Sequence, residues 1–418
     1  MGIFKNKLFR KLFFASFTSQ MGSTIGNMAF AFYLLDHFSK QPYFATLAEL
    51  MYSLPIVLVF FLVGVAADRF DRKKIAENSD WIRVILTAAL FAFIHFHLLI
   101  LVFAVLFIRS AVSKFFAPAE MSILQGVLDK DQYMQASGLN QTVMGLFMLF
   151  GVGLGALSYH YFGVSGSIII DGISFMVSAI LIRSCHISQD VRLPNGKTKV
   201  KELNIKLVLT DFKAGLEYIL KNKLLLTIIS GFLIFGLING GFSVLPLFTM
   251  KYKLAPEHYK QFAAYFSIFL GIGFIIGSSI GSALVEKFKA YRVLISGVLL
   301  TGGMCILAGA MTNVWWFYAV ILAMGIILAP VNVALSGWMN ELVDPKFMGR
   351  VSGWLDPLMM TSHSAALAII AVIFPALIKV DSIYNAIGIL MLIVGTYYLI
   401  ILPRLVRKEK KVQIKFEM

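Results

Sequence analysis

Charged residues are scarce in this chain. Asp, Glu, Lys and Arg make up 14% of its 418 residues, whereas hydrophobic residues make up 59%. An average soluble domain has about 25% charged and roughly 45–50% apolar residues, so the composition excludes an ordinary water-soluble protein. Cysteine is almost absent as well. Cys185 and Cys305 lie in or at the ends of different apolar stretches, where we interpret them as small core residues and expect neither a disulfide nor a metal site.

Long apolar runs dominate the chain instead. Because a run of about 18 or more apolar residues indicates a membrane-spanning helix, the sequence predicts twelve such helices in an all-α integral membrane protein. The predicted spans are 12–36, 43–67, 77–95, 98–117, 134–161, 164–185, 224–250, 261–286, 290–311, 314–337, 351–377 and 381–403. The first apolar run is much longer than the core of a signal peptide, so we expect this span to be retained.

The few charges are unevenly placed. There are 22 Asp and Glu against 37 Lys and Arg, a formal net charge of +15. Most basic residues fall in the N-terminus, the loops after even-numbered spans, the central linker and the tail. The positive-inside rule therefore places both termini in the cytoplasm of a protein in the cell membrane. Topology and contact with anionic membrane lipids explain the basic excess, and nucleic acid is not an expected partner.

An internal repeat predicts two related halves. Residues 127–129 (Val-Leu-Asp) lead to Ser137-Gly138, and residues 342–344 (Leu-Val-Asp) lead to Ser352-Gly353 with the same spacing. The predicted domains are a six-helix bundle over 1–185, a cytoplasmic linker over 186–223, a second six-helix bundle over 224–403 and a basic cytoplasmic tail over 404–418. Within the linker, the pattern from Leu207 to Leu225 predicts an amphipathic helix, either on the inner membrane surface or in solvent.

The most specific motif lies between the second and third spans. It is Gly64-Val-Ala-Ala-Asp68-Arg69-Phe-Asp71-Arg72-Lys73-Lys74, and it resembles the loop signature of the major facilitator superfamily: Gly, three residues, Asp-Arg, one residue, Gly and two basic residues. Asp71 replaces the second glycine, a departure associated with the drug-efflux branch resembling macrolide and siderophore exporters. The resemblance implies the major facilitator fold, in which two pseudo-symmetric six-helix bundles surround a cavity that opens alternately to each side.

In that family the loop acts as a cytoplasmic latch that stabilises the outward-open state. The resemblance carries this role to Gly64, Asp68, Arg69, Arg72 and Lys73. A small residue such as Gly64 lets two helices approach closely in lipid. Across the next cytoplasmic loop, Glu120 and Asp129 are the expected partners of Arg69 and Arg72.

Glycines recur in two predicted spans. The fifth span contains Gly145, Gly151, Gly153 and Gly155, and the eighth contains Gly271, Gly273, Gly277 and Gly281. The first set resembles the exporter motif of the same superfamily, although Val152 stands where that motif has a proline. Close packing of helices through small residues is the alternative interpretation.

Ionisable residues inside predicted spans are costly and are therefore candidates for function. Arg83 lies within one turn of Asp80, which predicts a structural pair. Arg109 resembles the superfamily's buried arginine, thought to assist proton transfer, and Asp171 resembles an aspartate of the efflux branch. A polar clamp between helices is an equally good interpretation for Asp171.

The eleventh span carries a second candidate for proton coupling. Asp356 and His363 are seven residues apart and share a helix face. Pro357 loosens the backbone between them, and histidine titrates near neutral pH. The alternative is that Asp356 caps a kinked helix and that His363 bonds to a serine.

Polar stripes on several spans indicate the lining of a cavity, because lipid cannot satisfy polar side chains. The candidate lining residues are Ser19, Gln20, Ser23 and Asn27 in the first span, Asn239 and Ser243 in the seventh, and Asn332 and Ser336 in the tenth. With 37 Phe and 19 Met in the chain, these residues predict a large, adaptable cavity for an amphipathic small molecule.

These features together predict a monomeric secondary transporter that exports an amphipathic organic compound by proton antiport. The resemblance suggests macrolide-like drugs or siderophores as substrates. An importer, a uniporter and a translocase of lipid-like substrates are alternatives with the same fold. An integral-membrane enzyme is disfavoured, because no Ser/His/Asp arrangement lies at a border between loop and membrane. No cofactor is expected.

Overall fold

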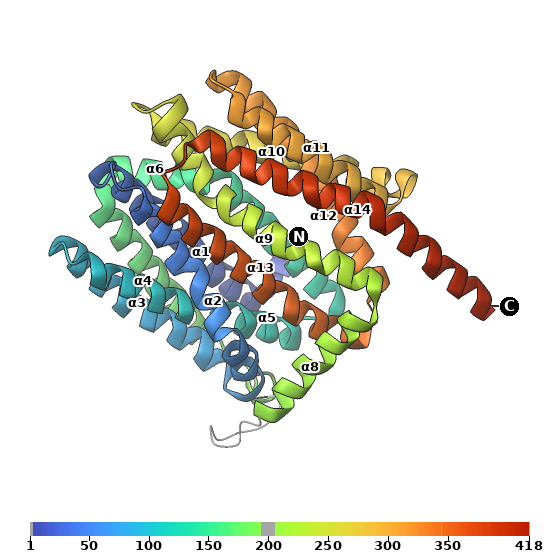
Figure 1. Ribbon diagram of the computed structural model, residues 1–418. Helices are drawn as coiled ribbons and strands as arrows, with labels where there is room; N and C mark the ends of the chain where they lie inside the picture. Colours follow the sequence, from blue (N-terminus) through green and yellow to red (C-terminus); the bar gives the residue numbers. More distant parts are fainter. Residues whose placement is uncertain (1–2, 194–204, 344, 418) are drawn as a thin grey trace. The chain divides into compact units, whose positions relative to one another are not determined.

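The computed structural model describes residues 3–193, 205–343 and 345–417, and within these residues the secondary structure is helical, without strands (Figure 1). The chain divides into two compact units, Met1–Ile205 and Lys206–Met418. The all-α class predicted from the apolar runs is confirmed. The domain boundaries predicted from the internal repeat and the linker composition stay a prediction.

Among its described residues, the first unit contains seven α-helices and a short 3-10 turn over Ile3–Lys5. Its helices are α1 (Lys7–His37), α2 (Tyr43–Arg69), α3 (Arg72–His95), α4 (Leu99–Ser113), α5 (Phe116–Val127), α6 (Lys130–Arg183) and α7 (Gln189–Arg192). Polar side chains define where two of them begin. Asn6 accepts hydrogen bonds from the backbone N–H groups of Leu8 and Phe9, and Asp71 accepts one from that of Lys74. Such caps satisfy N–H groups that have no partner within the helix.

The fourth predicted span is broken into α4 and α5. At the break the backbone N–H groups of Lys114 and Phe115 bond to the carbonyls of Ala111 and Val112, three residues back. Pro118 explains the interruption, because proline has no N–H for the carbonyl four residues earlier and its ring clashes with that carbonyl. Lys114 therefore ends α4 as its C-cap residue, inside a span that the sequence analysis treated as continuous.

Helix α6 contains both the fifth and the sixth predicted spans. They meet at Gly163, whose φ of 65° and ψ of −172° are not helical, a conformation that glycine adopts without steric cost. The arm before Gly163 packs closely on α1, since a Cβ atom added to Gly151 would lie 2.6 Å from Thr24 Cγ2 and one added to Gly155 would contact Met28. The packing interpretation is confirmed for Gly151 and Gly155, whereas Gly145 has open space around it.

The arm after Gly163 packs on α1 in the opposite direction. Here the glycines belong to α1: a Cβ atom added to Gly26 would lie 2.8 Å from Asp171 Oδ2, and one added to Gly22 would contact Ser174. As the residue number increases along α1, the number of the contacted residue decreases along this arm, so the arm runs antiparallel to α1. The two arms of α6 are antiparallel, with α1 packed against both of them.

The second unit contains α8 (Ile205–Lys221), α9 (Lys223–Thr249), a π-helical turn η3 (Met250–Leu254), α10 (Tyr259–Phe288), α11 (Ala290–Ala310), α12 (Val314–Leu342), α13 (Pro345–Ile373) and α14 (Val380–Glu417). Helices α11 and α14 run side by side (Figure 1). The amphipathic helix expected up to Leu225 ends earlier, at Lys221, because the Asn222 side chain caps α9. Helix α8 is fixed to α13: Trp354 Nε1 donates to the Phe212 carbonyl at 2.9 Å and the two rings stack.

Small residues bring α10 and α12 together in the second unit. A Cβ atom at Gly277 would contact the backbone carbonyl of Ile326, and one at Gly325 would contact that of Leu270. Backbones this close gain dispersion contacts that larger side chains would prevent, which is the usual way for helices to associate in lipid. The packing interpretation is therefore also confirmed for this part of the eighth predicted span.

Within the described residues, nine helical segments are long and apolar enough to cross a membrane. Three of the twelve predicted spans do not appear as separate segments among these nine. These are the span in α1, the charged span in α3, and one of the two spans that α6 joins. The number of crossings stays a prediction, whereas the multi-pass helical architecture is a property of the structure. Many large apolar side chains are exposed, including Ile100 and Val372, as expected for surfaces that face lipid.

Candidate functional site

Two ion pairs are buried in the first unit. Arg109 of α4 pairs with Asp171 of α6, and Arg83 of α3 pairs with Asp80 one turn earlier on the same helix. Both aspartates are fully buried. The pair of Asp80 and Arg83 was predicted and is confirmed. The partner of Arg109 was not predicted, because it lies on another helix.

Arg109 is held by further polar groups around its guanidinium. Its Nη2 atom donates to Asn27 Oδ1 at 2.8 Å and its Nη1 atom to Thr87 Oγ1 at 3.3 Å. One oxygen of Asp171 accepts from Arg109, whereas the other, Oδ1, has no hydrogen-bond partner in the described part of the structure. A buried carboxylate oxygen without a partner is costly, so this atom is the least satisfied part of the pair.

Phe175 lies between the two ion pairs. Its ring centroid is 4.2 Å from Cζ of Arg83 and 6.0 Å from Cζ of Arg109, distances at which a cation is attracted to a ring face. Arg83 also donates from Nη2 to Ser19 Oγ at 3.0 Å. Since Phe175 follows Asp171 by one turn of α6, a single helix supplies both the acid for one arginine and the aromatic face for the other.

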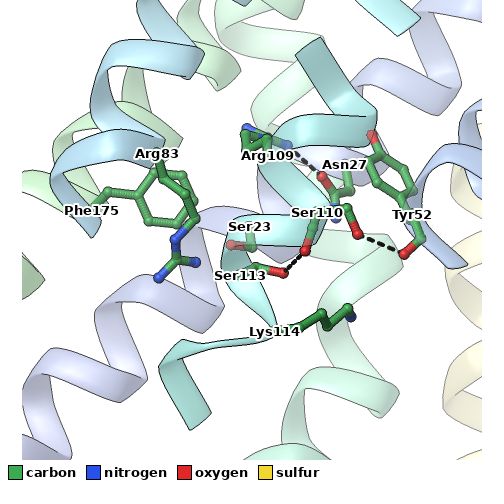
Figure 2. Close-up of a pocket in the computed structure, with 9 residues that line it drawn as sticks. All are labelled: Ser23, Asn27, Tyr52, Arg83, Arg109, Ser110, Ser113, Lys114 and Phe175. Carbon is green, nitrogen blue, oxygen red and sulfur yellow. Dashed lines mark hydrogen bonds between the residues drawn. The ribbon is translucent and has the colours of Figure 1, made fainter. Parts of the chain in front are cut away.

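These groups line a cavity of about 220 Å³. Figure 2 shows the residues around it: Ser23, Asn27, Tyr52, Arg83, Arg109, Ser110, Ser113, Lys114 and Phe175. Several are joined to one another, as Ser110 Oγ donates to the Tyr52 carbonyl at 2.6 Å and Ser113 Oγ to the Ser110 carbonyl at 2.7 Å. A second cavity of about 320 Å³ shares Ser23, Arg83 and Ser113 with the first.

The second cavity is more apolar. Its remaining lining residues are Ser19, Gln20, Thr24, Phe116, Ala117, Met144 and Phe147. The four polar residues predicted from the first span to line a cavity therefore lie at the two cavities of the first unit: Ser19 and Gln20 at the second, Asn27 at the first and Ser23 at both. A charged cavity beside a more apolar one suits a molecule with one polar and one apolar end.

Hydrogen bonds join the loop motif to the end of α6 and to the start of the linker. Arg192 of α7 donates from Nε to Asp71 Oδ1 at 3.1 Å and forms an ion pair with the same carboxylate. Lys73 Nζ donates to the carbonyls of Arg183 and Cys185, each at 2.8 Å. Arg72 donates from Nη1 to the carbonyl of Val191 at 3.4 Å. The departure from the family's glycine thus gives this loop a carboxylate that binds the linker.

The pKa of Asp71 is shifted by these contacts. Partial burial raises the pKa of this carboxyl group, but the hydrogen bonds from the Arg192 side chain and the Lys74 backbone, with the charge of Arg192, outweigh burial and hold the pKa below its usual value. The same hydrogen bond to Asp71 raises the pKa of Arg192. Asp71 is therefore ionised at neutral pH.

The other predicted latch residues are placed as follows. Gly64, Asp68 and Arg69 lie in the last two turns of α2, and their side chains are outside the described part of the structure. Arg72 also donates to the Ser122 carbonyl of α5 at 3.4 Å, and Glu120, two residues earlier on the same helix, is buried. The latch stays a prediction.

The second unit contains the predicted pair on α13. His363 is buried and its Nδ1 atom lies 3.2 Å from Oδ1 of Asn239 on α9, within hydrogen-bond distance, whereas Asp356 is exposed. The histidine thus contacts a predicted cavity residue of another helix instead of a serine. Ser243 donates to the Gly240 carbonyl, Asn332 donates to the Leu328 carbonyl, and Ser336 is exposed. The structure does not bring Asp356 and His363 into contact through any hydrogen bond among the described residues.

Sequence reasoning missed Tyr52, Lys114 and Phe175 at the cavity. Tyr52 and Phe175 are single aromatic residues among many. Lys114 follows Ser110 and Ser113 near the inner end of a span, where a lysine is normally attributed to the positive-inside rule. The spacing of three and four residues from Ser110 to Ser113 and Lys114 would have placed these three side chains on one helix face. Among the described residues, no cluster of three or more His, Cys, Asp or Glu could hold a metal ion.

Comparisons with known proteins agree over most of the chain. The family described as Major Facilitator Superfamily matches residues 12–368. The chain is 49% identical to the uncharacterised MFS-type transporter YkuC of Bacillus subtilis over 99% of this chain and 97% of that protein. It is 23% identical to macrolide efflux protein A of Streptococcus pyogenes over 90% and 91%. A solved POT family transporter in complex with a thioalcohol-conjugated peptide covers 95% of this chain and 96% of its own, with a TM-score of 0.75 at 13% identity.

Proposed function

Because the chain belongs to the major facilitator superfamily, and is therefore a multi-pass membrane transporter and not an enzyme, we propose that it exports an amphipathic organic compound in exchange for protons. The named efflux relatives support the direction, since macrolide efflux protein A and the putative bacilysin exporter BacE of Bacillus subtilis are both similar to this chain. Macrolide-like and siderophore-like compounds are the substrate classes that we propose. We further propose a monomer in the cell membrane with both termini in the cytoplasm.

The observation that carries the proposal is the buried pair of Arg109 and Asp171 at the edge of the polar cavity. Asp171 Oδ1 has no partner among the described residues, so a proton can bind there and weaken the ion pair. Arg109 would then keep Asn27 and Thr87 as partners and be free to shift toward the cavity that it lines. A proton that binds one conformational state better than the other shifts the equilibrium between them, which is the requirement for coupling.

His363 and Asp356 are the second candidate for proton coupling. His363 is bonded to Asn239 across two helices, so a change of its protonation alters a contact between α9 and α13. Asp356 is exposed on α13 and can exchange protons with water. Protonation would act differently at the two sites. At Asp171 it breaks an ion pair, whereas at His363 it creates a charge.

Transport by purified protein in proteoliposomes tests this function. An imposed pH gradient should drive a macrolide such as erythromycin against its concentration gradient. Asp171→Asn, which cannot take up a proton, should abolish this uphill transport per folded molecule and retain downhill exchange, because exchange needs only that the two states interconvert with substrate bound. Full uphill transport by Asp171→Asn would exclude Asp171, and the same measurement on His363→Gln and Asp356→Asn would then test the second site.

The loop motif is proposed to act as the cytoplasmic latch. Asp68→Asn should cripple transport while the protein still inserts into the membrane at normal abundance, because the latch acts on the equilibrium between conformations. Glu120 and Lys73 are proposed to support the same contact surface. Normal efflux by Asp68→Asn protein at normal abundance would contradict the latch.

Import is the alternative with the same fold. Right-side-out and inverted membrane vesicles distinguish it from export, because an exporter accumulates substrate only in inverted vesicles under a matching proton gradient. Accumulation in right-side-out vesicles alone would replace the proposal of export with one of import.

A further inference from the structure

Three cationic side chains line the cavity of the first unit, and two of them have ion-pair partners. Arg83 and Arg109 each have an aspartate, whereas the ammonium group of Lys114 has no hydrogen bond or ion pair to a side chain in the described part of the structure. Lys114 nevertheless lines the cavity, beside Ser113 (Figure 2). The carboxyl groups of Glu49 and Glu120 belong to neighbouring helices and line neither cavity. Three cationic side chains and no carboxylate therefore line the space.

The helix break adds a second source of positive potential. Helix α5 begins at Phe116, directly after Lys114 and Phe115, and no side chain caps its first N–H groups. Phe116 and Ala117 form part of the wall of the second cavity. The N-terminus of a helix carries a partial positive charge and unsatisfied N–H groups, and it attracts anions. Pro118 removes one N–H group from this end but leaves those of Phe116 and Ala117.

The two cavities adjoin each other where these groups meet, because they share Ser23, Arg83 and Ser113. Arg83 and Ser113 line both, so a molecule that enters the apolar cavity beside Met144 and Phe147 can reach the cationic cavity with one end. Arg83 directs one guanidinium nitrogen to Asp80 and Ser19, while its Nε atom has no partner among the described residues. A buried N–H donor of this kind is stabilised by an acceptor from a ligand.

We propose that the transported molecule carries an anionic head group, a carboxylate or a phosphate, which Lys114 and Arg83 bind beside the N-terminus of α5 while its apolar part lies against Phe147 and Met144. This proposal rests on the proposed transport function and narrows its substrates to amphipathic compounds with an anionic head group, which erythromycin, a tertiary amine, does not have. The ion pairs keep Arg83 and Arg109 in place when the cavity is empty. Lys114 supplies the charge that recognises the head group.

Binding to purified full-length protein in detergent tests the proposal without a proton gradient. Three fluorescent probes share a dodecyl chain with a nitrobenzoxadiazole group at its end and differ in their head groups: a carboxylate, its methyl ester and an amine. The carboxylate should bind at least about tenfold more tightly than the ester, as expected for one charge-assisted contact. Dodecyl phosphate should displace it, and inorganic phosphate at the same concentration should not, because only the amphipath also occupies the apolar cavity.

Substitutions test whether the preference for the carboxylate over the ester arises from the cavity. Lys114→Gln should lower the affinity for the carboxylate about tenfold and leave the affinity for the ester unchanged, whereas Lys114→Arg should retain the preference. Lys287→Gln removes one positive charge from an exposed position on α10 and should have no effect. Size-exclusion profiles establish that each variant is folded.

Equal binding of the three probes, a preference for the amine, or a carboxylate preference that survives Lys114→Gln would overturn the proposal. Failure of the transport function gives a different result. A protein that binds the carboxylate through Lys114 but pumps nothing refutes proton-driven export and leaves this inference standing. A protein that pumps a macrolide but ignores the carboxylate refutes this inference alone.

Discussion

Removing one member of the buried pair between Arg109 and Asp171 should destabilise the first unit strongly. Asp171→Asn keeps the shape of the side chain but leaves the Arg109 guanidinium, which is buried, without a counter-charge. Breaking a buried ion pair in this way costs about 3–5 kcal/mol. Because 1 kcal/mol corresponds to roughly 2–4 °C for a domain of about 150–250 residues, the Tm should fall by roughly 6–20 °C.

The double variant Arg109→Gln/Asp171→Asn distinguishes this cause from a simple loss of packing. With both charges removed, the two amides can hydrogen-bond, and Asn27 and Thr87 remain as further partners. The double variant should therefore be more stable than either single variant, with a coupling free energy of about 1–3 kcal/mol in the double-mutant cycle. Thermal unfolding of the four purified proteins in one detergent, followed by tryptophan fluorescence, measures all the required values.

Two results would refute this reasoning. A Tm of Asp171→Asn within about 2 °C of the parent would mean that Arg109 gains little from the carboxylate, against the cost expected for a buried unpaired charge. A double variant whose loss equals the sum of the single losses would mean that the two residues do not interact energetically. Either result would also remove the physical basis for proton coupling at Asp171.

Three further predictions test other contacts. Gly26→Ala should cost about 1–3 kcal/mol in unfolding free energy, because the new Cβ atom would lie 2.8 Å from Asp171 Oδ2, whereas Gly145→Ala, with open space around it, should be neutral or slightly stabilising in the same thermal assay. Asp71→Asn keeps the helix cap and loses the ion pair to the linker, so it should raise the rate at which maleimide labels the buried thiol of Cys185 at pH 7 and lower stability by up to about 1 kcal/mol. Since the pKa of Asp71 is lowered in the folded protein, this contribution to stability should be constant from pH 5 to pH 8 and be lost only as the pH falls through the folded pKa; a loss near pH 6 would contradict the assignment. Trp354→Phe keeps the stacked ring but loses the hydrogen bond to α8, and limited trypsin digestion should cleave this helix several-fold faster; unchanged cleavage would show that stacking alone holds it.

Much of the helical architecture could be predicted from the sequence because it depends on local information. Apolar runs gave the helices, and the three-residue spacing on one helix gave the pair of Asp80 and Arg83. The pair of Arg109 and Asp171 joins residues 62 positions apart, and only the folded chain shows which helix faces which. Each of the two residues was singled out correctly as a costly buried charge, but the sequence contained no signal that joined them.

Other features were visible in the sequence but had a more ordinary interpretation. In the sequence Lys114 has the position of an ordinary basic residue at the inner end of a span. Its place at a helix break can be predicted only if Pro118 is taken to interrupt the helical hydrogen bonds. Asp71 was noted as a departure from the family motif, yet its partner Arg192 lies in the linker, where spacing carries no information about contact. The role of a departure depends on the residue that it meets in the fold.

The single-residue reversal at Gly163 has a mechanical consequence. A connection of one residue has no slack, and the hydroxyl groups of Ser158 and Ser167 tie the two arms together beside it at 2.8 Å. The two arms are therefore held together at this end, and α1 packs closely on both of them. We therefore expect α1 and the two arms of α6 to move together as one rigid group in any conformational change of the first unit. The break between α4 and α5, where the regular helical hydrogen bonds are interrupted, is a place where the unit can bend without disturbing this packing.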